Sequence, residues 1–216
     1  MATSSTQIAN FAIGHIGIAK QIANLESDNS REALACRLFY TTALEKVLGD
    51  FNWPFATKFI SLGLVEENPT SEWAYSYRYP SDCLNLRRIL SGVRNDNRQS
   101  IIPFRVGQDD TGALIYTDAE DAEMEYTVRV TDTARFSPNF SIALSYLLAS
   151  YIVPMIVGSD RFKMIPGLLQ LYDAELRNAQ AGALNEQQDE QLPESEFIRA
   201  RDGINSFDTS TSFRSF

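Results

Sequence analysis

The stretch FSPNFSIALSYLLASYIVPMIVGS, residues 136–159, contains no charged side chain between Arg135 and Asp160. An apolar run of this length predicts a helix that is either buried on most of its faces or inserted in a membrane. The run is diluted by Ser141, Ser145, Ser150 and Pro154, and no basic clusters flank it, so we expect a helix buried in a core or between subunits. Pro154 should kink or end that helix.

Helical patterns occur on both sides of this stretch in the sequence. Apolar spacing predicts a first helix over residues 6–19. A second helix is expected over residues 31–48, because Ser30 is a favourable N-cap. A last helix is expected over 166–184, with Pro166 in its first turn. These three helices can surround the uncharged one, which predicts a helical bundle.

Between the two helical parts the periodicity becomes alternating. Residues 73–79 and 123–131 alternate between two kinds of side chain in the manner of strands. Shorter strands are predicted at 84–89, 101–106 and 114–117. Together they predict one small antiparallel sheet. The expected fold class is therefore α+β, a helical bundle domain with an inserted small antiparallel β-sheet and an extended C-terminal tail.

The end of the chain has a different composition from the rest. Glu, Gln, Asp and Ser dominate it, which predicts a tail that a partner orders. The expected organisation is a helical domain of residues 1–57 and 135–185, a β domain of 58–134 and a tail of 186–216. Apolar and basic side chains interrupt the polar tail, and docking on a partner would explain them. These candidates are Phe197, Ile198, Arg199, Arg201, Phe207, Phe213 and Phe216.

The charge balance excludes some classes of function. The chain has 216 residues, with 28 Asp and Glu against 19 Lys and Arg, so its formal net charge is −9. Phosphate binding needs clustered positive charge, so this chain is a poor candidate for gripping nucleic acid or an anionic membrane. Its two cysteines, Cys36 and Cys83, lack CxxC spacing, which predicts free thiols.

The sequence offers little catalytic chemistry. His15 is the only histidine and lies on an apolar helix face, so we expect it to be packed and hydrogen-bonded. A zinc site is not expected without a second histidine. An acidic run could bind a cation or supply two hydrolase carboxylates, although a solvated loop is the simpler interpretation. The run consists of Asp118, Glu120, Asp121, Glu123 and Glu125.

Three places in the sequence carry a resemblance to a known family. They are IANFAIG at 8–14 with IANLES at 22–27, FNWPFA at 51–56 with YSYRYPSDCL at 75–84, and YDAEL at 172–176. In this order and spacing the chain resembles the podovirus tail tubular protein A family, the head-to-tail adaptors of short-tailed phages. The resemblance spans most of residues 5–185, whereas the tail matches by position and character.

The resemblance implies a structural function. Members of that family form a dodecameric ring that joins the portal protein to the tail nozzle protein, and DNA passes through the channel without specific binding. The resemblance implies that the tail docks on the portal and that Trp73, Tyr75 and Tyr77 belong to a nozzle-facing β domain. It also implies a virion protein of the tail and neck, present in the host cytoplasm during assembly, with no enzymatic activity, cofactor or membrane contact.

Two other classes of function stay open at this stage. A tail-associated peptidoglycan hydrolase would use the acidic run, and a membrane-associated protein would use the uncharged helix. Alanine substitutions in the acidic run test the first, and solubility without detergent tests the second.

Overall fold

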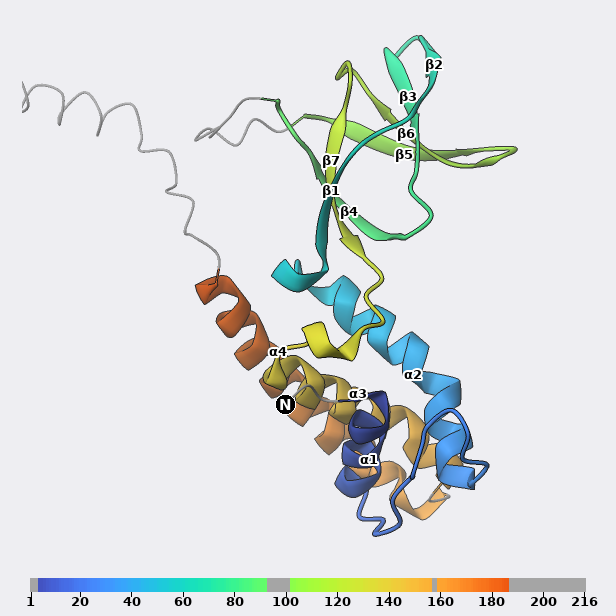
Figure 1. Ribbon diagram of the computed structural model, residues 1–216, viewed down its shortest axis with the longest axis vertical. Helices are drawn as coiled ribbons and strands as arrows, with labels where there is room; N and C mark the ends of the chain where they lie inside the picture. Colours follow the sequence, from blue (N-terminus) through green and yellow to red (C-terminus); the bar gives the residue numbers. More distant parts are fainter. Residues whose placement is uncertain (1–3, 93–101, 157–158, 187–216) are drawn as a thin grey trace, which may run out of the picture.

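The computed structural model describes residues 4–92, 102–156 and 159–186, which form a helical body and a β body at opposite ends of an elongated molecule (Figure 1). The helical body holds α1 (Ser5–His15), α2 (Arg31–Asp50), α3 (Pro138–Ile156) and α4 (Ile165–Asn185). The chain forms the β body between α2 and α3. The predicted α+β class, with antiparallel strands inserted into a helical bundle, is confirmed. The predicted tail lies outside the described residues.

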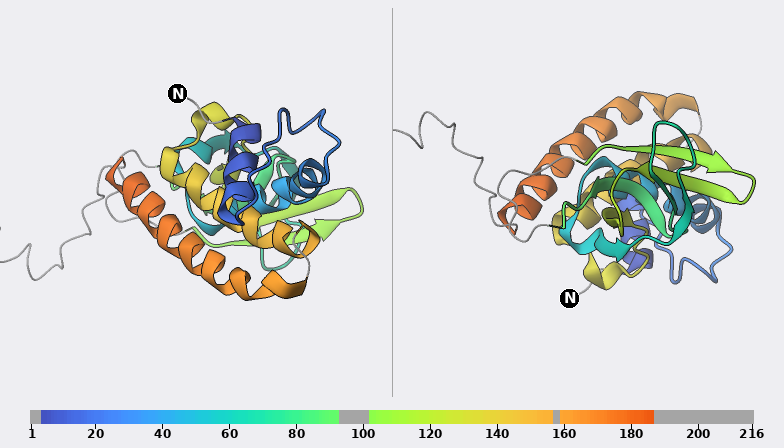
Figure 2. Two further views of the ribbon diagram at one scale, coloured as in Figure 1. Left: turned by 90° about the horizontal axis from the view of Figure 1, so that it is seen from below. Right: turned by 90° about the horizontal axis from the view of Figure 1, so that it is seen from above.

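Helix α3 is the centre of the helical body, because α1, α2 and α4 all pack on it (Figures 1 and 2). Its serines are buried with its apolar side chains, and the hydroxyls of Ser145 and Ser150 each donate to a backbone carbonyl of the preceding turn at 2.7 Å. Within the described ranges α3 alone is long and apolar enough to span a membrane, and the other helices bury most of it.

Helix α3 carries Pro154 in its last turn, and α1 ends earlier than the sequence predicts. Helix α3 continues past Pro154 to Ile156, because a proline in the last turn removes only one helical hydrogen bond. Helix α1 ends at His15, short of the predicted residue 19. Gly17 has a φ of 77°, which takes the backbone out of the helical region.

The β body contains two antiparallel sheets, so the prediction of one sheet is wrong. The first has the order β1-β7-β4, from β1 (Thr57–Ser61), β7 (Glu123–Val128) and β4 (Cys83–Ile89). The second has the order β2-β3-β6-β5, from β2 (Leu64–Glu67), β3 (Tyr75–Arg78), β6 (Gly112–Thr117) and β5 (Phe104–Asp109). Tyr77 and Ile115 of the second sheet share one buried cluster with Met124 and Tyr126 of the first. Two layers can enclose such a core, and a single small sheet cannot.

The two bodies meet at the C-terminal end of α2. Arg87 of β4 donates to the carbonyl of Phe51 at 2.7 Å and to the hydroxyl of Thr127 at 2.8 Å. Asn85 donates to the carbonyl of Gly49 at 3.1 Å. Carbonyls at a helix end lack helical partners, so these side chains satisfy them and fasten the β body to α2.

An ion pair and a buried carboxylate complete this junction. Arg129 lies 2.7 Å from Glu45 of α2. Glu125 is buried and accepts from Asn52 at 3.0 Å and from Arg88 at 2.6 Å. The junction therefore combines several directional polar contacts with apolar packing, because Leu84 of β4 and Val128 of β7 pack against the helical core.

Candidate assembly surfaces

The acidic run divides among structural contacts. Glu125 belongs to the junction, Asp118 accepts from the backbone amide of Ala74 at 2.9 Å, and Glu123 accepts from Ser61 at 3.3 Å. The other two carboxylates, Glu120 and Asp121, are exposed between β6 and β7. Among the residues described, no three His, Cys, Asp or Glu side chains gather closely enough to hold a metal ion.

His15 is packed and hydrogen-bonded, as predicted. Its ring stacks on Tyr146 with centroids 3.9 Å apart, and Nε2 lies 3.0 Å from the Ser145 hydroxyl. Because that hydroxyl donates to the carbonyl of Ile142, Nε2 of His15 is the donor in the contact. Burial lowers the pKa of His15, which favours the neutral ring at pH 7. Both cysteines are free thiols, which confirms that prediction too.

The three aromatic residues expected on the nozzle-facing surface lie in different environments. Tyr77 is 2% exposed and its hydroxyl donates to the carbonyl of Ala119 at 2.8 Å, so it supports the core and cannot contact a partner. Trp73 and Tyr75 are partly exposed. The charge of nearby Glu120 is the main cause that raises the pKa of Tyr75. Of these three residues, Trp73 and Tyr75 are exposed enough to contact a partner protein.

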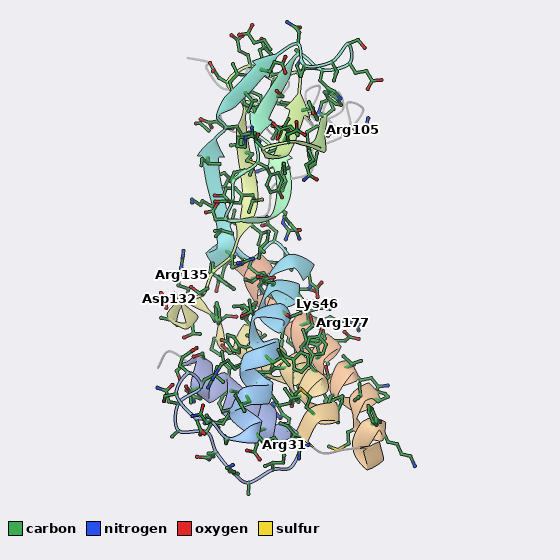
Figure 3. The ribbon with its side chains drawn as sticks, turned by 90° about the vertical axis from the view of Figure 1, so that its right-hand side faces the viewer. Arg31, Lys46, Arg105, Asp132, Arg135 and Arg177 are labelled. Atoms are coloured by element: carbon green, nitrogen blue, oxygen red, sulfur yellow. The ribbon has the colours of Figure 1, made fainter. Side chains whose placement is uncertain are left out.

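Large apolar side chains are exposed at the end of the helical body farthest from the β body. Arg31 donates to the carbonyl of Met155, so the start of α2 adjoins the end of α3, and Figure 3 shows Arg31 at this end of the molecule. We call the exposed apolar residues here the distal helical surface, although they share an end of the body and not one face, since Leu169 and Leu171 lie about 200° apart around α4. It comprises Leu34 and Leu38 of α2, Met155 of α3, Phe162 of the η3 turn (Ser159–Met164), and Leu169 and Leu171 of α4.

A second group of exposed apolar side chains lies on the β body. Four exposed apolar residues lie close together in the sequence: Phe59 and Ile60 of β1, and Leu64 and Val65 of β2. Both strands are edges of their sheets. Val106 is exposed on β5, the opposite edge of the second sheet. Such edges are templates for pairing with another chain.

Sequence reasoning missed both surfaces. The signal for the second was present, because the stretch KFISLGLV at 58–65 has apolar side chains on both faces of its strands. The predicted portal-docking residues, Phe197, Ile198, Arg199, Arg201, Phe207, Phe213 and Phe216, lie outside the described residues.

The chain matches no model of a known protein family and no curated protein. Its function therefore has to be argued from its own surfaces.

Proposed function

We propose that this chain is the structural head-to-tail adaptor of a short-tailed phage. Copies of it form a dodecameric ring that joins the portal to the tail nozzle and leaves a channel for DNA. The observation that carries this proposal is the presence of exposed large apolar side chains on both bodies of one elongated chain. The resemblance to the tail tubular protein A family supplies the identity of the two partners.

The exposed surfaces support contact with other proteins rather than catalysis. Burying one large apolar side chain gains about 1.5–3 kcal/mol, so several exposed together mark a surface that another chain covers. An enzyme needs polar groups that converge in a cleft. The five carboxylates of the acidic run instead serve separate contacts or face solvent. The junction at α2 gives the two ends a fixed relation, which an adaptor between two partners requires.

The net charge of the chain suits passage of DNA. The chain has a formal net charge of −9, and an acidic lining of the proposed channel would repel phosphates and let DNA slide without being held. In the proposed assembly the tail reaches the portal, and the β body, with Trp73 and Tyr75 exposed in part, faces the nozzle.

The test combines the full chain with purified portal rings and examines the mixture by cryo-electron microscopy. We expect twelve-fold density beneath the portal, and a freely dispersed monomer would contradict the adaptor function. A second chain lacking residues 190–216 should lose portal binding. The matched control keeps the tail length and replaces Phe207, Phe213 and Phe216 with serine, which separates the apolar contacts from the tail backbone. Undiminished binding by the truncated chain would remove the tail from the proposal.

A further inference from the structure

The two edges of the second sheet carry complementary side chains. Edge strand β2 exposes Leu64, Val65 and Glu66, and edge strand β5 exposes Arg105 and Val106. In the part of the chain that the structure describes, no strand pairs with the outer side of β2 or of β5. Neither Glu66 nor Arg105 forms an ion pair with any described residue. Figure 3 shows Arg105 on the β body.

The register places these complementary residues at matching heights. Glu66 pairs with Ser76, Ser76 with Tyr116, and Tyr116 with Arg105, so Glu66 and Arg105 end one row across the sheet. In the neighbouring row Leu64 pairs with Tyr77, Tyr77 with Ile115, and Ile115 with Val106. The first row thus ends in two opposite charges, Glu66 on β2 and Arg105 on β5. The second row ends in two exposed apolar side chains, Leu64 on β2 and Val106 on β5.

The strand directions permit the sheet to continue from copy to copy. All neighbours in the order β2-β3-β6-β5 are antiparallel, so β2 and β5 have opposite chain sense, with the twist of the sheet between them. Cyclic symmetry keeps all copies in one orientation, and β5 of one copy would therefore meet β2 of the next as an antiparallel neighbour. The β5–β6 hairpin projects sideways from the molecule, where a neighbour can reach it (Figures 1 and 2).

We infer that β5 of one copy pairs with β2 of the next copy, so that the second sheet becomes continuous around the assembly. In this pairing Arg105 of one copy faces Glu66 of its neighbour, and Val106 faces Leu64. The bulge in β2 between Leu64 and Glu66 leaves Val65 without a partner on β3, and the neighbouring copy covers its side chain. Backbone hydrogen bonds supply affinity, and the two rows supply the register.

This inference rests on the proposed ring for the shared orientation of the copies, but its test needs no portal. Sedimentation velocity is measured on the full chain alone from about 1 µM to about 1 mM, a range that brackets weak self-association. The variants are Glu66→Arg, Arg105→Glu and the double variant. Each single variant places like charges opposite each other across the new strand pair and should weaken association about tenfold or more. The double variant restores opposite charges and should recover association.

The matched control is Glu72→Arg, which makes the same charge change on the β body but lies between β2 and β3, off both rows. It should leave association unchanged, and circular dichroism should show that all variants are folded. A wild-type chain that stays monomeric throughout, or a double variant as weak as the single ones, overturns the inference. Self-association that follows this pattern without ring density on the portal would keep the inference and reject the adaptor function.

Discussion

Arg87 is the residue whose replacement tests whether the junction couples the two bodies. Replacement by methionine keeps an apolar stem of similar length and removes the guanidinium. Two short hydrogen bonds disappear, to Phe51 at 2.7 Å and to Thr127 at 2.8 Å, and Thr127 is fully buried. Bonds from a charged donor contribute about 1.5 kcal/mol each at the low end, which gives about 3 kcal/mol. Burial lowers the pKa of Arg87, which shows that desolvating the guanidinium opposes this gain. We therefore expect a net loss of about 2 kcal/mol in the free energy of unfolding.

The two tryptophans of the chain make this loss measurable in each body separately. Trp53 is buried in the helical body, where its indole donates to the carbonyl of Val47 at 2.8 Å, and Trp73 lies in the β body. Single-tryptophan chains are made by Trp53→Phe and Trp73→Phe, and urea unfolding is followed by fluorescence. Because Trp53→Phe itself removes a buried indole and its hydrogen bond, each single-tryptophan chain carrying Arg87→Met is compared with the same chain carrying Arg87. Arg87→Met should move the midpoint reported by Trp73 to lower urea by more than the midpoint reported by Trp53.

The control is Lys46→Met, at the same end of α2. The ammonium of Lys46 lies 3.4 Å from Asp50 in an exposed pair, so its loss should change the free energy of unfolding by no more than about 0.5 kcal/mol. The reasoning fails if Arg87→Met behaves like Lys46→Met. It fails equally if Arg87→Met shifts the two midpoints by the same amount, each measured against its own parent chain.

Three further substitutions test other parts of the structure. Phe140→Ala removes a fully buried ring that contacts Trp53, Phe55 and Phe136. Unfolding in guanidinium chloride should show that the free energy of unfolding falls by about 3–5 kcal/mol. Tyr172→Phe removes the 2.8 Å bond from its hydroxyl to Asp50 and should cost about 1 kcal/mol by the same measurement. The guanidinium of Arg78 holds the pKa of the Asp109 carboxyl well below its usual range. This stability is present above the unfolded pKa of about 4 and is lost as the pH falls through the folded pKa, so the difference between wild type and Asp109→Asn should shrink in acid titration below about pH 4.

Much of the helical body could be predicted from local signals. The Ser30 side chain accepts from the amide of Ala33, and α2 begins at Arg31 as its sequence predicts. Residues 136–159 have no charged side chain that favours contact with water, and α3 within them is the buried centre of the helical body. The division of the β body into two sheets could not be predicted, since pairing between distant strands leaves no mark in any single one of them.

The distal helical surface was beyond prediction for a different reason. Leu34 and Leu38 occur at helical spacing in α2 and look like its core face, yet both are exposed. The buried side of α2 is formed in part by the small side chains of Ala33, Cys36 and Ala43, which belong to the core cluster of the helical body. The side of a helix that is buried depends on the neighbour it packs against. A face of small residues can pack closely against bulky side chains, so it can be buried in place of a leucine face.

The junction and the open sheet edges would together determine how cooperatively copies close into the proposed ring. A copy that touches its neighbour through both its helical body and its β body makes two contacts, and the second forms at an effective concentration set by the link between the bodies. Asn85, Arg87 and Arg129 contribute to that link through their contacts with α2 and its end, and in the proposed ring these contacts would keep the β2 and β5 edges at one height relative to the helices. A loose link would let each edge sample other heights and other registers, which weakens pairing without removing any contact at the edges themselves. The polar contacts at the end of α2 would thereby set how cooperatively copies close into a ring. They would do so although they lie away from the surfaces where the copies meet.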